Sequence, residues 1–352
     1  MSAKAQKVLV AMSGGVDSAV AAHLLRESGY DVAGVHFTFD LGGGCSSVGG
    51  EDDARRCAEA LGIELRVVST TGAMKPIIDY FVGEYARGRT PNPCPVCNAT
   101  VKFARLLALA DEMSADFVAT GHHARVVRDG DAPALYRARY LAKDQSYALF
   151  ALPREFLHRI LLPVGELQSK QAVRETARSL ELPVHDKPES QDICFLAAGD
   201  YTDLLAVRAP QALTPGDIVN SAGEVLGRHA GVGRYTIGQR RGLGIAAAEP
   251  LYVTALDAES ATVTVGTKSE VYSESLTASA ANWHCEPQGE FAATVKIRYN
   301  HEGAPARVRL LGQDSFEVRF DEPVAAITPG QAAVCYDGDR LLGGGWIDSS
   351  DR

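Results

Sequence analysis

VLVAMSGGVDS, residues 8–18, is the stretch that decides the fold of this chain. A short apolar run leads into Gly14 and Gly15, and apolar residues recur after them at helical spacing. The pattern predicts a buried strand, a tight turn and a helix whose N-terminus points back at the turn. Bare backbone N–H groups and the helix dipole would together favour an anion such as phosphate at this point.

The side chains of the turn add to this prediction. Ser13 and Ser18 offer hydroxyl donors, and Asp17 is a candidate ligand for Mg²⁺ beside the phosphates. The turn has no Walker lysine and no Gly-x-Gly-x-x-Gly opening. It resembles the pyrophosphatase loop (PP-loop) of ATP-dependent adenylating enzymes. The alternative interpretation is an ordinary tight turn between a strand and a helix.

The first two hundred residues or so alternate between strand-like and helix-like segments, which predicts a doubly wound parallel α/β sheet. The expected strands are Lys7–Met12, Val32–Phe39, Leu65–Ser69 and Phe117–Thr120. The expected helices are Val16–Ser28, Asp52–Leu61, Lys102–Met113 and Lys170–Leu182. Ligands of such sheets bind at the carboxyl ends of the strands, where SGGVDS and the segment from Thr120 to His122 would both lie.

The texture of the sequence changes after about Tyr201, where prolines and glycines separate short segments. We expect a loop-rich β domain and then a small antiparallel β-barrel, whose strands would include Ala292–Tyr299, Ala306–Leu311 and Ser315–Phe320. The predicted domains are therefore residues 1–204 for the α/β sheet with its ATP-binding loop, 205–267 for the loop-rich β domain, and 268–352 for the barrel.

Composition narrows the class of protein. A chain of 352 residues suits two or three domains. No apolar run approaches the ~18 residues of a membrane span, and the first strand starts too early for a signal peptide, so we expect a cytoplasmic protein. The net charge is −9, yet the stretch 225–248 has no acid and four arginines, including Arg240 and Arg241. That basic stretch is either a phosphate-contacting loop or a solvated turn.

Two separated cysteine sites stand out. TPNPCPVCN, residues 90–98, holds Cys94 and Cys97 in a proline-rich loop ahead of a helix, where a thiolate would be stabilised. SQDICF, residues 190–195, holds Cys194. Three interpretations compete: half of a zinc site, an iron–sulfur cluster on three cysteines, or a catalytic pair that exchanges sulfur. The remaining cysteines have the character of loop or core residues: Cys45, Cys57, Cys285 and Cys335.

These motifs together resemble the MnmA family of tRNA-specific 2-thiouridylases. The segments that carry the resemblance, in the order and spacing of the family, are SGGVDS, TPNPCPVCN with KF four residues on, TGHH, KDQSY, SQDICF, IGQRRGLG and TPGQAAV. The match extends from near Lys7 to the glycines at 343–345. The resemblance implies an enzyme that uses ATP and Mg²⁺ to thiolate carbon 2 of the wobble uridine of tRNA.

The resemblance also implies a sequence of chemical steps. ATP adenylates the C2 carbonyl oxygen, a poor leaving group, and the PP-loop holds the phosphates that leave as pyrophosphate. Cys194 carries a persulfide whose sulfur attacks C2, and AMP departs. Cys97 then frees sulfide or forms a Cys97–Cys194 disulfide that an external reductant reopens. The implied partners are tRNA and a persulfide donor such as a cysteine desulfurase or sulfur-relay protein, with the enzyme acting as a monomer.

Other site residues are implied by position in the family motifs. Those at nucleotide-binding positions are Ala11, Met12, Ser13, Gly14, Gly15, Val16, Asp17, Ser18, Phe37 and Gly121. Those at positions that touch the target base are Asn92, Pro93 and Cys94. Those at tRNA-contacting positions are His122, Lys143, Asp144, Gln145, Arg298, Tyr299 and Gln331, to which the basic stretch adds Arg240 and Arg241.

The chain departs from the familiar family pattern at Cys94, where familiar members carry Asp, although other members share the Cys-x-x-Cys version. A carboxylic acid at this point can help activate the base or the neighbouring thiol, and here a third sulfur replaces it. The substitution favours a [4Fe–4S] cluster on Cys94, Cys97 and Cys194 more than an Asp would. Other function classes also remain: a different PP-loop enzyme such as an amidotransferase or ligase, or a tRNA-binding module that carries a metal.

Overall fold

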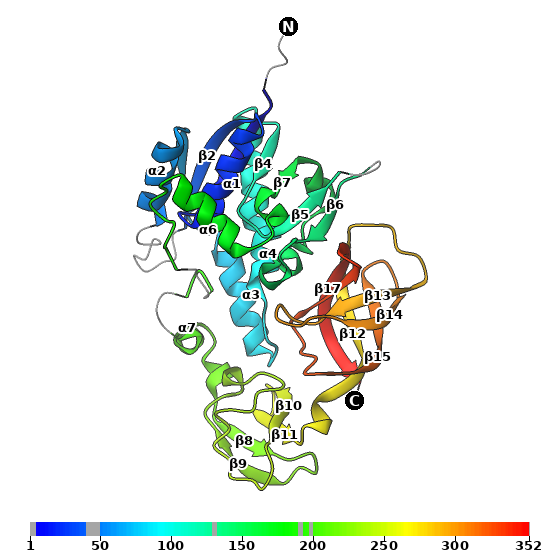
Figure 1. Ribbon diagram of the computed structural model, residues 1–352. Coiled ribbons are helices and arrows are strands. Elements are labelled where there is room, and N and C mark those ends of the chain that lie inside the picture. Colours follow the sequence, from blue (N-terminus) through cyan, green and yellow to red (C-terminus); the bar gives the residue numbers. More distant parts are fainter. Residues whose placement is uncertain (1–4, 40–49, 129–131, 189–192, 197–199, 352) are drawn as a thin grey trace. The chain divides into compact units, whose positions relative to one another are not determined.

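The computed structural model describes residues 5–39, 50–128, 132–188, 193–196 and 200–351 (Figure 1). Contacts divide the chain into two compact units. The first unit consists of residues 1–75, 94–195 and 339–341, and the second consists of residues 76–93, 196–338 and 342–352. Each unit has its own hydrophobic core.

A five-stranded parallel sheet forms the centre of the first unit, with strand order β3-β2-β1-β4-β7. Its strands are β1 (Lys7–Ala11), β2 (Asp31–Thr38), β3 (Leu65–Ser69), β4 (Phe117–Ala119) and β7 (Ile160–Leu161). Strand β1 is central because its residues pair with β2 on one side and β4 on the other, with Leu9 opposite both Ala33 and Val118. The PP-loop therefore leaves the sheet from its middle strand. A two-stranded antiparallel hairpin follows, formed by β5 (Ala124–Val127) and β6 (Ala134–Arg137).

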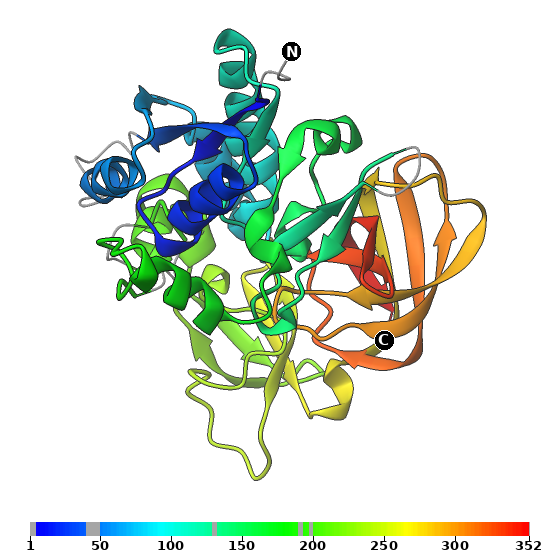
Figure 2. The same cartoon turned by 45° about the horizontal axis from the view of Figure 1, so that its top comes forward.

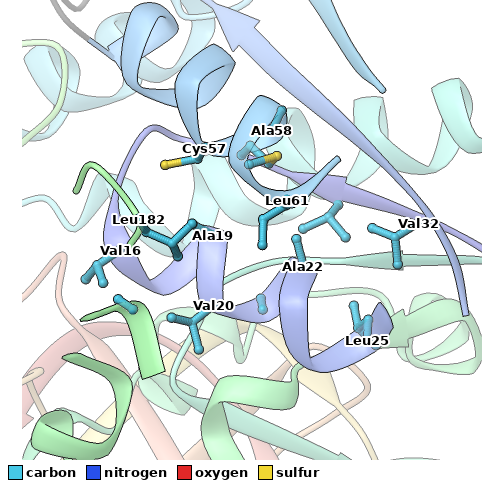
Figure 3. Packing of buried hydrophobic residues seen from close by; sticks show 14 of the residues in the cluster. Val16, Ala19, Val20, Ala22, Leu25, Val32, Cys57, Ala58, Leu61 and Leu182 are labelled. Atoms are coloured by element: carbon cyan, nitrogen blue, oxygen red, sulfur yellow. The ribbon is translucent and has the colours of Figure 1, made fainter. Parts of the chain in front are cut away.

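Helices cover both faces of this sheet. Val8 and Val10 of β1 belong to one buried cluster with residues of three helices, and Figure 3 shows its packing around Val16, Val20 and Leu61. The helices of this face are α1 (Val16–Glu27), α2 (Gly50–Leu61) and α6 (Lys170–Ser179). Because side chains alternate along a strand, Leu9 points to the opposite face, where α5 (Phe103–Glu112) contacts β1 and β4.

The second unit begins with helical and β-rich segments of the middle of the chain. Its helices are α3 (Lys75–Ala86), of which all but the first residue belongs here, and α7 (Tyr201–Arg208). Its first sheet has the order β10-β11-β8-β9, with strands β8 (Gly216–Val219), β9 (Val225–His229), β10 (Tyr252–Asp257) and β11 (Thr262–Gly266). Ile218, Val253, Val263 and Val265 form its buried core with neighbouring apolar residues.

Six long antiparallel strands complete the second unit as a closed barrel. Its strands are β12 (Tyr272–Trp283), β13 (Glu290–Lys296), β14 (Ala304–Leu310), β15 (Ser315–Ala325), β16 (Ala332–Asp337) and β17 (Arg340–Asp351). The strand order is β12-β15-β14-β13-β16-β17, and pairing of β12 with β17 closes the ring. In Figure 2 the orange and red strands curl into this barrel. Full closure leaves no sheet edge within the barrel that would need protection.

The structure confirms the predicted fold class: a doubly wound parallel sheet, then a small β domain, then an antiparallel barrel. Two local expectations were incomplete. The sequence analysis gave no helix at Lys75–Ala86, and it placed Cys94 and Cys97 in a loop although both lie in the short helix α4 (Pro93–Cys97). None of the helices in the described part of the chain is both long and apolar enough to cross a membrane.

Candidate active site

The PP-loop connects β1 to α1 and presents an uncapped helix N-terminus. Gly14 has φ +76°, in the region that favours glycine, and Gly15 is the N-cap of α1 without a side-chain cap. The Ser18 hydroxyl donates to the Gly15 carbonyl at 3.0 Å and accepts from the Ser13 N–H at 3.2 Å. Ser18 thus holds the turn closed and leaves N–H groups at the start of α1 without a capping side chain, as an anion site requires.

Two glycines allow the chain to close tightly around this loop. A Cβ added at Gly14 would lie 2.2 Å from the carbonyl oxygen of Gly50, where α2 begins. A Cβ added at Gly121, just after β4, would lie 2.5 Å from the Ser18 nitrogen and 2.6 Å from the Asp17 carbonyl carbon. Both positions therefore exclude a side chain, and the loop is fixed from two sides.

A cavity of about 280 Å³ opens at the carboxyl ends of the strands. Its walls include Met12, Phe37, Lys102, Gly121 and His122, along with Ala11, Ser13, Asp17 and Ser18 of the loop. The sequence assigned most of these residues to the nucleotide, and the fold brings them together in one wall. An apolar hollow beside an anion site is the arrangement that a nucleotide needs, with its base in the hollow and its phosphates at the loop.

One buried histidine of this wall has an unsatisfied atom. His36 Nδ1 lies 2.7 Å from the carbonyl oxygen of Met12. Because a carbonyl can only accept, Nδ1 must carry the proton, and Nε2 of the neutral ring is then an acceptor. Nε2 is buried without a hydrogen-bond partner among the described residues.

A second cavity, of about 270 Å³, lies against the other side of the PP-loop. Backbone and side chains of residues 13–17 line it together with three lysines, Lys143, Lys170 and Lys187. Lys187 Nζ donates to the Gly14 carbonyl at 2.9 Å and to Asp53 Oδ2 at 2.5 Å. Cationic groups therefore gather where the loop presents its N–H groups.

Asp17 is the centre of a partly buried ion-pair group. The Lys170 ammonium lies 2.6 and 2.8 Å from its two carboxylate oxygens, and His123 Nε2 lies 3.1 Å from Oδ1. Burial opposes ionisation of Asp17, but the hydrogen bonds and charges of His123 and Lys170 outweigh it and hold the carboxyl pKa below its usual range. The carboxylate already has the Lys170 ammonium and the His123 ring as partners, so these residues as placed do not fit the expected Mg²⁺ site at Asp17.

The two cysteines of TPNPCPVCN lie on α4, with Cys94 exposed and Cys97 buried. A π-helical turn follows at Asn98–Lys102, in which the Phe103 N–H donates to the Asn98 carbonyl. Lys102, the last residue of this turn, is close enough for its charge to act on the Cys97 thiol. Turns of this kind are frequent at functional sites.

The thiol of the buried Cys97 is held in its neutral form. Burial raises the pKa of Cys97 to about 11 and also raises that of Cys94. The charge of Lys102 acts in the opposite direction on both, and Cys194 is close enough to raise both further. The expectation of a stabilised thiolate is therefore wrong for this state, because desolvation outweighs the charge of Lys102.

The same cysteines were also predicted to be cluster ligands. Within the described ranges, no group of three or more His, Cys, Asp or Glu side chains is placed to hold a metal ion. Cys94, Cys97 and Cys194 thus influence one another but do not form a ready ligand set, and the residues as placed do not fit a [4Fe–4S] cluster. Ser190, Gln191, Asp192 and Cys45 lie outside the described residues. Cys57 and Cys335 are core residues, and Cys285 is half-buried.

Four residues assigned to tRNA contacts lie in the first unit. His122 stacks on Phe103, and burial, with Lys102 next, lowers its pKa to about 3, so its imidazole is neutral. The buried Asp144 carboxylate accepts from the N–H groups of Ala138 and Ser146 and from the Ser146 hydroxyl. Its side chain is therefore used inside the fold. Gln145 accepts from the His123 N–H at 2.9 Å and lines both cavities, and Lys143 lines the cavity of the lysines.

The remaining tRNA assignments lie in the second unit. Gln331 Nε2 donates to the Thr90 and Pro91 carbonyls at 3.1 and 3.2 Å, which ties it to the segment just before Asn92 and Pro93. Tyr299 and Arg298 are exposed, and Arg298 donates to the Ala325 and Ala326 carbonyls. Arg240 and Arg241 are exposed between β9 and β10. A surface of this kind is accessible to a nucleic acid.

Four residues that lie beside the PP-loop or the thiols in the structure were not predicted as site residues from the sequence. They are Lys102, His123, Lys170 and Lys187. Lys102 was quoted within KF and His123 within TGHH, but neither was given a role. Lys170 begins a helix and Lys187 lies in a later turn, both far from SGGVDS in the sequence, so no local spacing connects them with that motif. Only the fold places them beside the loop.

Comparisons with known proteins agree with this geometry. Three family models match the chain: the tRNA methyl transferase HUP domain at residues 6–198, the tRNA methyl transferase PRC-barrel domain at 202–267, and the aminomethyltransferase beta-barrel domain at 273–347. The chain is 47% identical over 353 residues to the tRNA-specific 2-thiouridylase MnmA of Syntrophotalea carbinolica, which covers 99% of this chain and 100% of that protein.

A second relative and one solved structure complete the comparison. The tRNA-specific 2-thiouridylase MnmA of Carboxydothermus hydrogenoformans is 47% identical over 357 residues, covering 97% of this chain and 98% of its own. The solved structure of U34-tRNA thiolase NcsA from Methanococcus maripaludis with its [4Fe-4S] cluster is 23% identical and covers 58% of this chain and 67% of its own, with a TM-score of 0.36. A likeness that weak carries no argument about this chain.

Proposed function

The chain belongs to the MnmA family of tRNA-specific 2-thiouridylases, and from this premise we propose that it thiolates carbon 2 of the wobble uridine by adenylation and persulfide transfer. The 2-thiolation of a tRNA uridine and the use of ATP follow from the family. The position of the uridine, the chemical steps and the residues that perform them are the proposal. In it, residues 1–204 perform catalysis, residues 205–267 bind tRNA, and residues 268–352 form the barrel.

The observation that carries the proposal is the position of Lys102. Its side chain lines the nucleotide cavity together with Gly121 and His122, and its charge acts on the thiols of Cys94 and Cys97. One cation is therefore shared by the place where a nucleotide fits and the place where sulfur chemistry can occur. An enzyme that only adenylates would have no use for two thiols at this point.

In the adenylation step, the PP-loop holds ATP by its phosphates, and the base of ATP occupies the cavity beside Phe37. The C2 carbonyl oxygen of the uridine attacks the α-phosphorus, and the bond to the β-phosphate oxygen breaks. Pyrophosphate leaves at the loop, where N–H groups stabilise the developing negative charge. Asn92, Pro93 and Cys94 touch the uridine, which an anticodon loop can present at low cost because it is single-stranded.

In the sulfur step, a persulfide on Cys194 attacks C2 with its terminal sulfur, and AMP leaves with the former carbonyl oxygen. Cys97 then attacks the inner sulfur of the C2–S–S–Cys194 linkage. The electron pair of the broken S–S bond goes to the sulfur on C2, which gives the 2-thiouridine and a Cys97–Cys194 disulfide. Alternatively, Cys97 attacks the persulfide first and frees hydrosulfide, which then attacks C2. In both routes a dithiol reductant reopens the disulfide.

Replacing Cys194 with Ser tests the proposal. The variant is incubated with ATP, unmodified tRNA and a persulfide donor, and the digested tRNA is analysed by nucleoside mass spectrometry. We expect no 2-thiouridine above background, because serine cannot carry a persulfide. Cys285→Ser is the matched control, since Cys285 is a half-buried cysteine of the barrel with no role in the proposal. Normal 2-thiouridine from Cys194→Ser would overturn the sulfur step.

A second measurement separates this function from its alternatives. ATP–pyrophosphate exchange that is independent of tRNA and of Cys97 and Cys194 would favour another PP-loop enzyme, such as an amidotransferase or ligase. Tight tRNA binding without ATP turnover would favour a binding module. Iron and sulfide analysis after anaerobic purification tests the cluster: activity that rises in proportion to bound iron would contradict the free-thiol route.

A further inference from the structure

We propose that Lys170 and Lys187 form the subsite that binds the two terminal phosphates of ATP and the pyrophosphate that leaves. The inference rests on the proposed function, because it assumes that ATP phosphates occupy the PP-loop. It adds two residues that lie outside SGGVDS and outside every motif of the sequence comparison. It also gives a role to the cavity that Lys143, Lys170 and Lys187 line, which neither the adenine base nor the uridine occupies in the proposed function.

The loop carries a negative charge of its own. Asp17 places a carboxylate in the first turn of α1, inside an anion site, and its lowered pKa keeps it negative. An uncompensated carboxylate there would repel phosphate. The Lys170 ammonium bridges both oxygens of Asp17, and its side chain is only 12% exposed. A buried lysine of this kind is costly unless it is paired, so the position is held specifically for a cation.

Lys187 contacts the backbone of the loop. Its ammonium donates to the Gly14 carbonyl and to Asp53, which occupies two of its three N–H donors. Holding that carbonyl fixes the peptide between Gly14 and Gly15, because carbonyl and N–H of a trans peptide are rigidly opposed. Lys187 thus sets the orientation of the loop N–H groups and adds a positive charge to the cavity wall.

Both lysines and the loop line one cavity of about 270 Å³. This volume is large enough for a pyrophosphate group and ordered water. Because the carboxylate partners of the lysines, Asp17 and Asp53, belong to α1 and α2, the cations are held in place before any ligand arrives. Preorganised charge of this kind stabilises the leaving group without the cost of reorganising the site. We therefore assign the cavity to the β- and γ-phosphates.

The proposal predicts a selective loss of affinity for ligands that carry the terminal phosphates. In Lys170→Gln we expect the Kd for ATP and for inorganic pyrophosphate, measured by calorimetry on the full chain, to rise at least about tenfold, as for the loss of a charge-assisted hydrogen bond. The Kd for AMP should change less than about threefold. Lys187→Gln should show the same pattern with a smaller rise, and Lys170→Arg should recover part of the affinity.

Arg174→Gln is the matched control, because Arg174 follows Lys170 by one turn of α6 and carries the same charge but does not line the cavity. Its ATP affinity should match that of the unmodified chain. Equal losses for ATP and AMP in Lys170→Gln would overturn the proposal, since they would show a general effect on the nucleotide site. Thermal unfolding confirms that each variant is folded, and Lys187→Gln and Lys170→Arg test the subsite if Lys170→Gln is not.

The double variant Asp17→Asn with Lys170→Gln separates direct phosphate binding from simple neutralisation of Asp17. Under the proposal, ATP affinity remains low in the double variant, because the phosphate still lacks its cation. Full recovery would show that Lys170 only cancels the charge of Asp17, and would overturn its role as a phosphate ligand. Failure of the function proposed above is distinguishable, since the unmodified chain would then not bind ATP or would make no 2-thiouridine.

Discussion

Two regions of the first unit differ in how completely they are prepared for chemistry. The phosphate side consists of the PP-loop with Lys170 and Lys187, and the sulfur side consists of Cys94, Cys97 and Lys102. On the phosphate side, Gly14 and Gly121 fix the loop, and Lys170 and Lys187 are paired with carboxylates in place. On the sulfur side, Cys97 has a pKa of about 11, so its reactive thiolate form is scarce at neutral pH. The anion site is built in advance, whereas the thiol of Cys97 is predominantly neutral.

The difference has a chemical reason. An ion pair between lysine and carboxylate is inert and can be held permanently, but a permanent accessible thiolate would be open to oxidation and to unwanted disulfides. Burial keeps Cys97 neutral, and Lys102 is placed to favour its thiolate when the balance changes.

The largest expected effect concerns the rigid side. Gly14→Ala should destabilise the first unit by about 2–3 kcal/mol, because alanine is strained at φ +76° and its Cβ would lie 2.2 Å from the Gly50 oxygen. The displaced loop should lose most of its affinity for ATP. Thermal unfolding and calorimetry with ATP measure both effects.

Gly15→Ala is the matched control for this prediction. Gly15 has φ −104°, and the nearest atom to an added Cβ is the Ser13 Oγ at 3.4 Å, an ordinary contact. Its stability should therefore change by less than about 1 kcal/mol. If both alanine variants bound ATP like the unmodified chain, the phosphate side would be adaptable rather than built in advance, and the comparison would fail.

An intermediate effect concerns the pH dependence of the sulfur side. Only the thiolate reacts with iodoacetamide, and a folded-state pKa of about 11 leaves about a thousandth of Cys97 ionised at pH 8. Alkylation of Cys97 in the folded chain, followed by peptide mass spectrometry, should thus accelerate about tenfold per pH unit between pH 7 and pH 10. The sign follows from the raised pKa: the neutral thiol predominates below it, and reactivity increases as the pH approaches it.

Lys102→Gln should slow this alkylation about three- to tenfold at pH 8, because the lysine charge lowers the thiol pKa and its removal raises it further. Arg105→Gln is the control, since Arg105 is an exposed cation near the start of the same helical segment that does not influence the thiols. An alkylation rate that levels off below pH 8 would show a stored thiolate, and the sulfur side would then be as fully prepared as the phosphate side.

The sequence was sufficient for the parts of the molecule that local patterns encode. Strands, helices and the PP-loop follow from apolar periodicity and glycine placement, and the observed β1 and α1 lie within one residue of the expected ranges. Helix α3 was missed because residues 75–86 mix aromatic, charged and proline residues without a clear period. The pairing of Lys170 with Asp17 spans 153 positions, and such contacts exist only after folding.

Charge and burial at the thiols were also beyond the sequence. The residues around Cys94 and Cys97 correctly indicated a helix start, which by itself lowers a thiol pKa. The opposing desolvation depends on how deeply α4 and the π-helical turn are packed, and this is a property of the tertiary structure. The local sequence thus gave the wrong direction for the acidity of these thiols.

The smallest expected effect concerns how the segment before the cysteines is held. Gln331 donates to the Thr90 and Pro91 carbonyls, and the Thr90 N–H donates to the Pro329 carbonyl, all within the second unit. We expect Gln331→Ala to lower kcat for thiolation about three- to tenfold, with a tRNA Kd changed less than about twofold, because two neutral hydrogen bonds that position the segment are lost. Gln331→Glu should be at least as severe, since a carboxylate cannot donate to the two carbonyls and would be repelled by them.

If Gln331 instead contacted tRNA directly, as its sequence position implied, the Kd would rise while kcat at saturating tRNA stayed unchanged. Single-turnover kinetics and filter binding separate the two outcomes and show whether the segment leading to Cys94 is positioned by the protein or by the substrate.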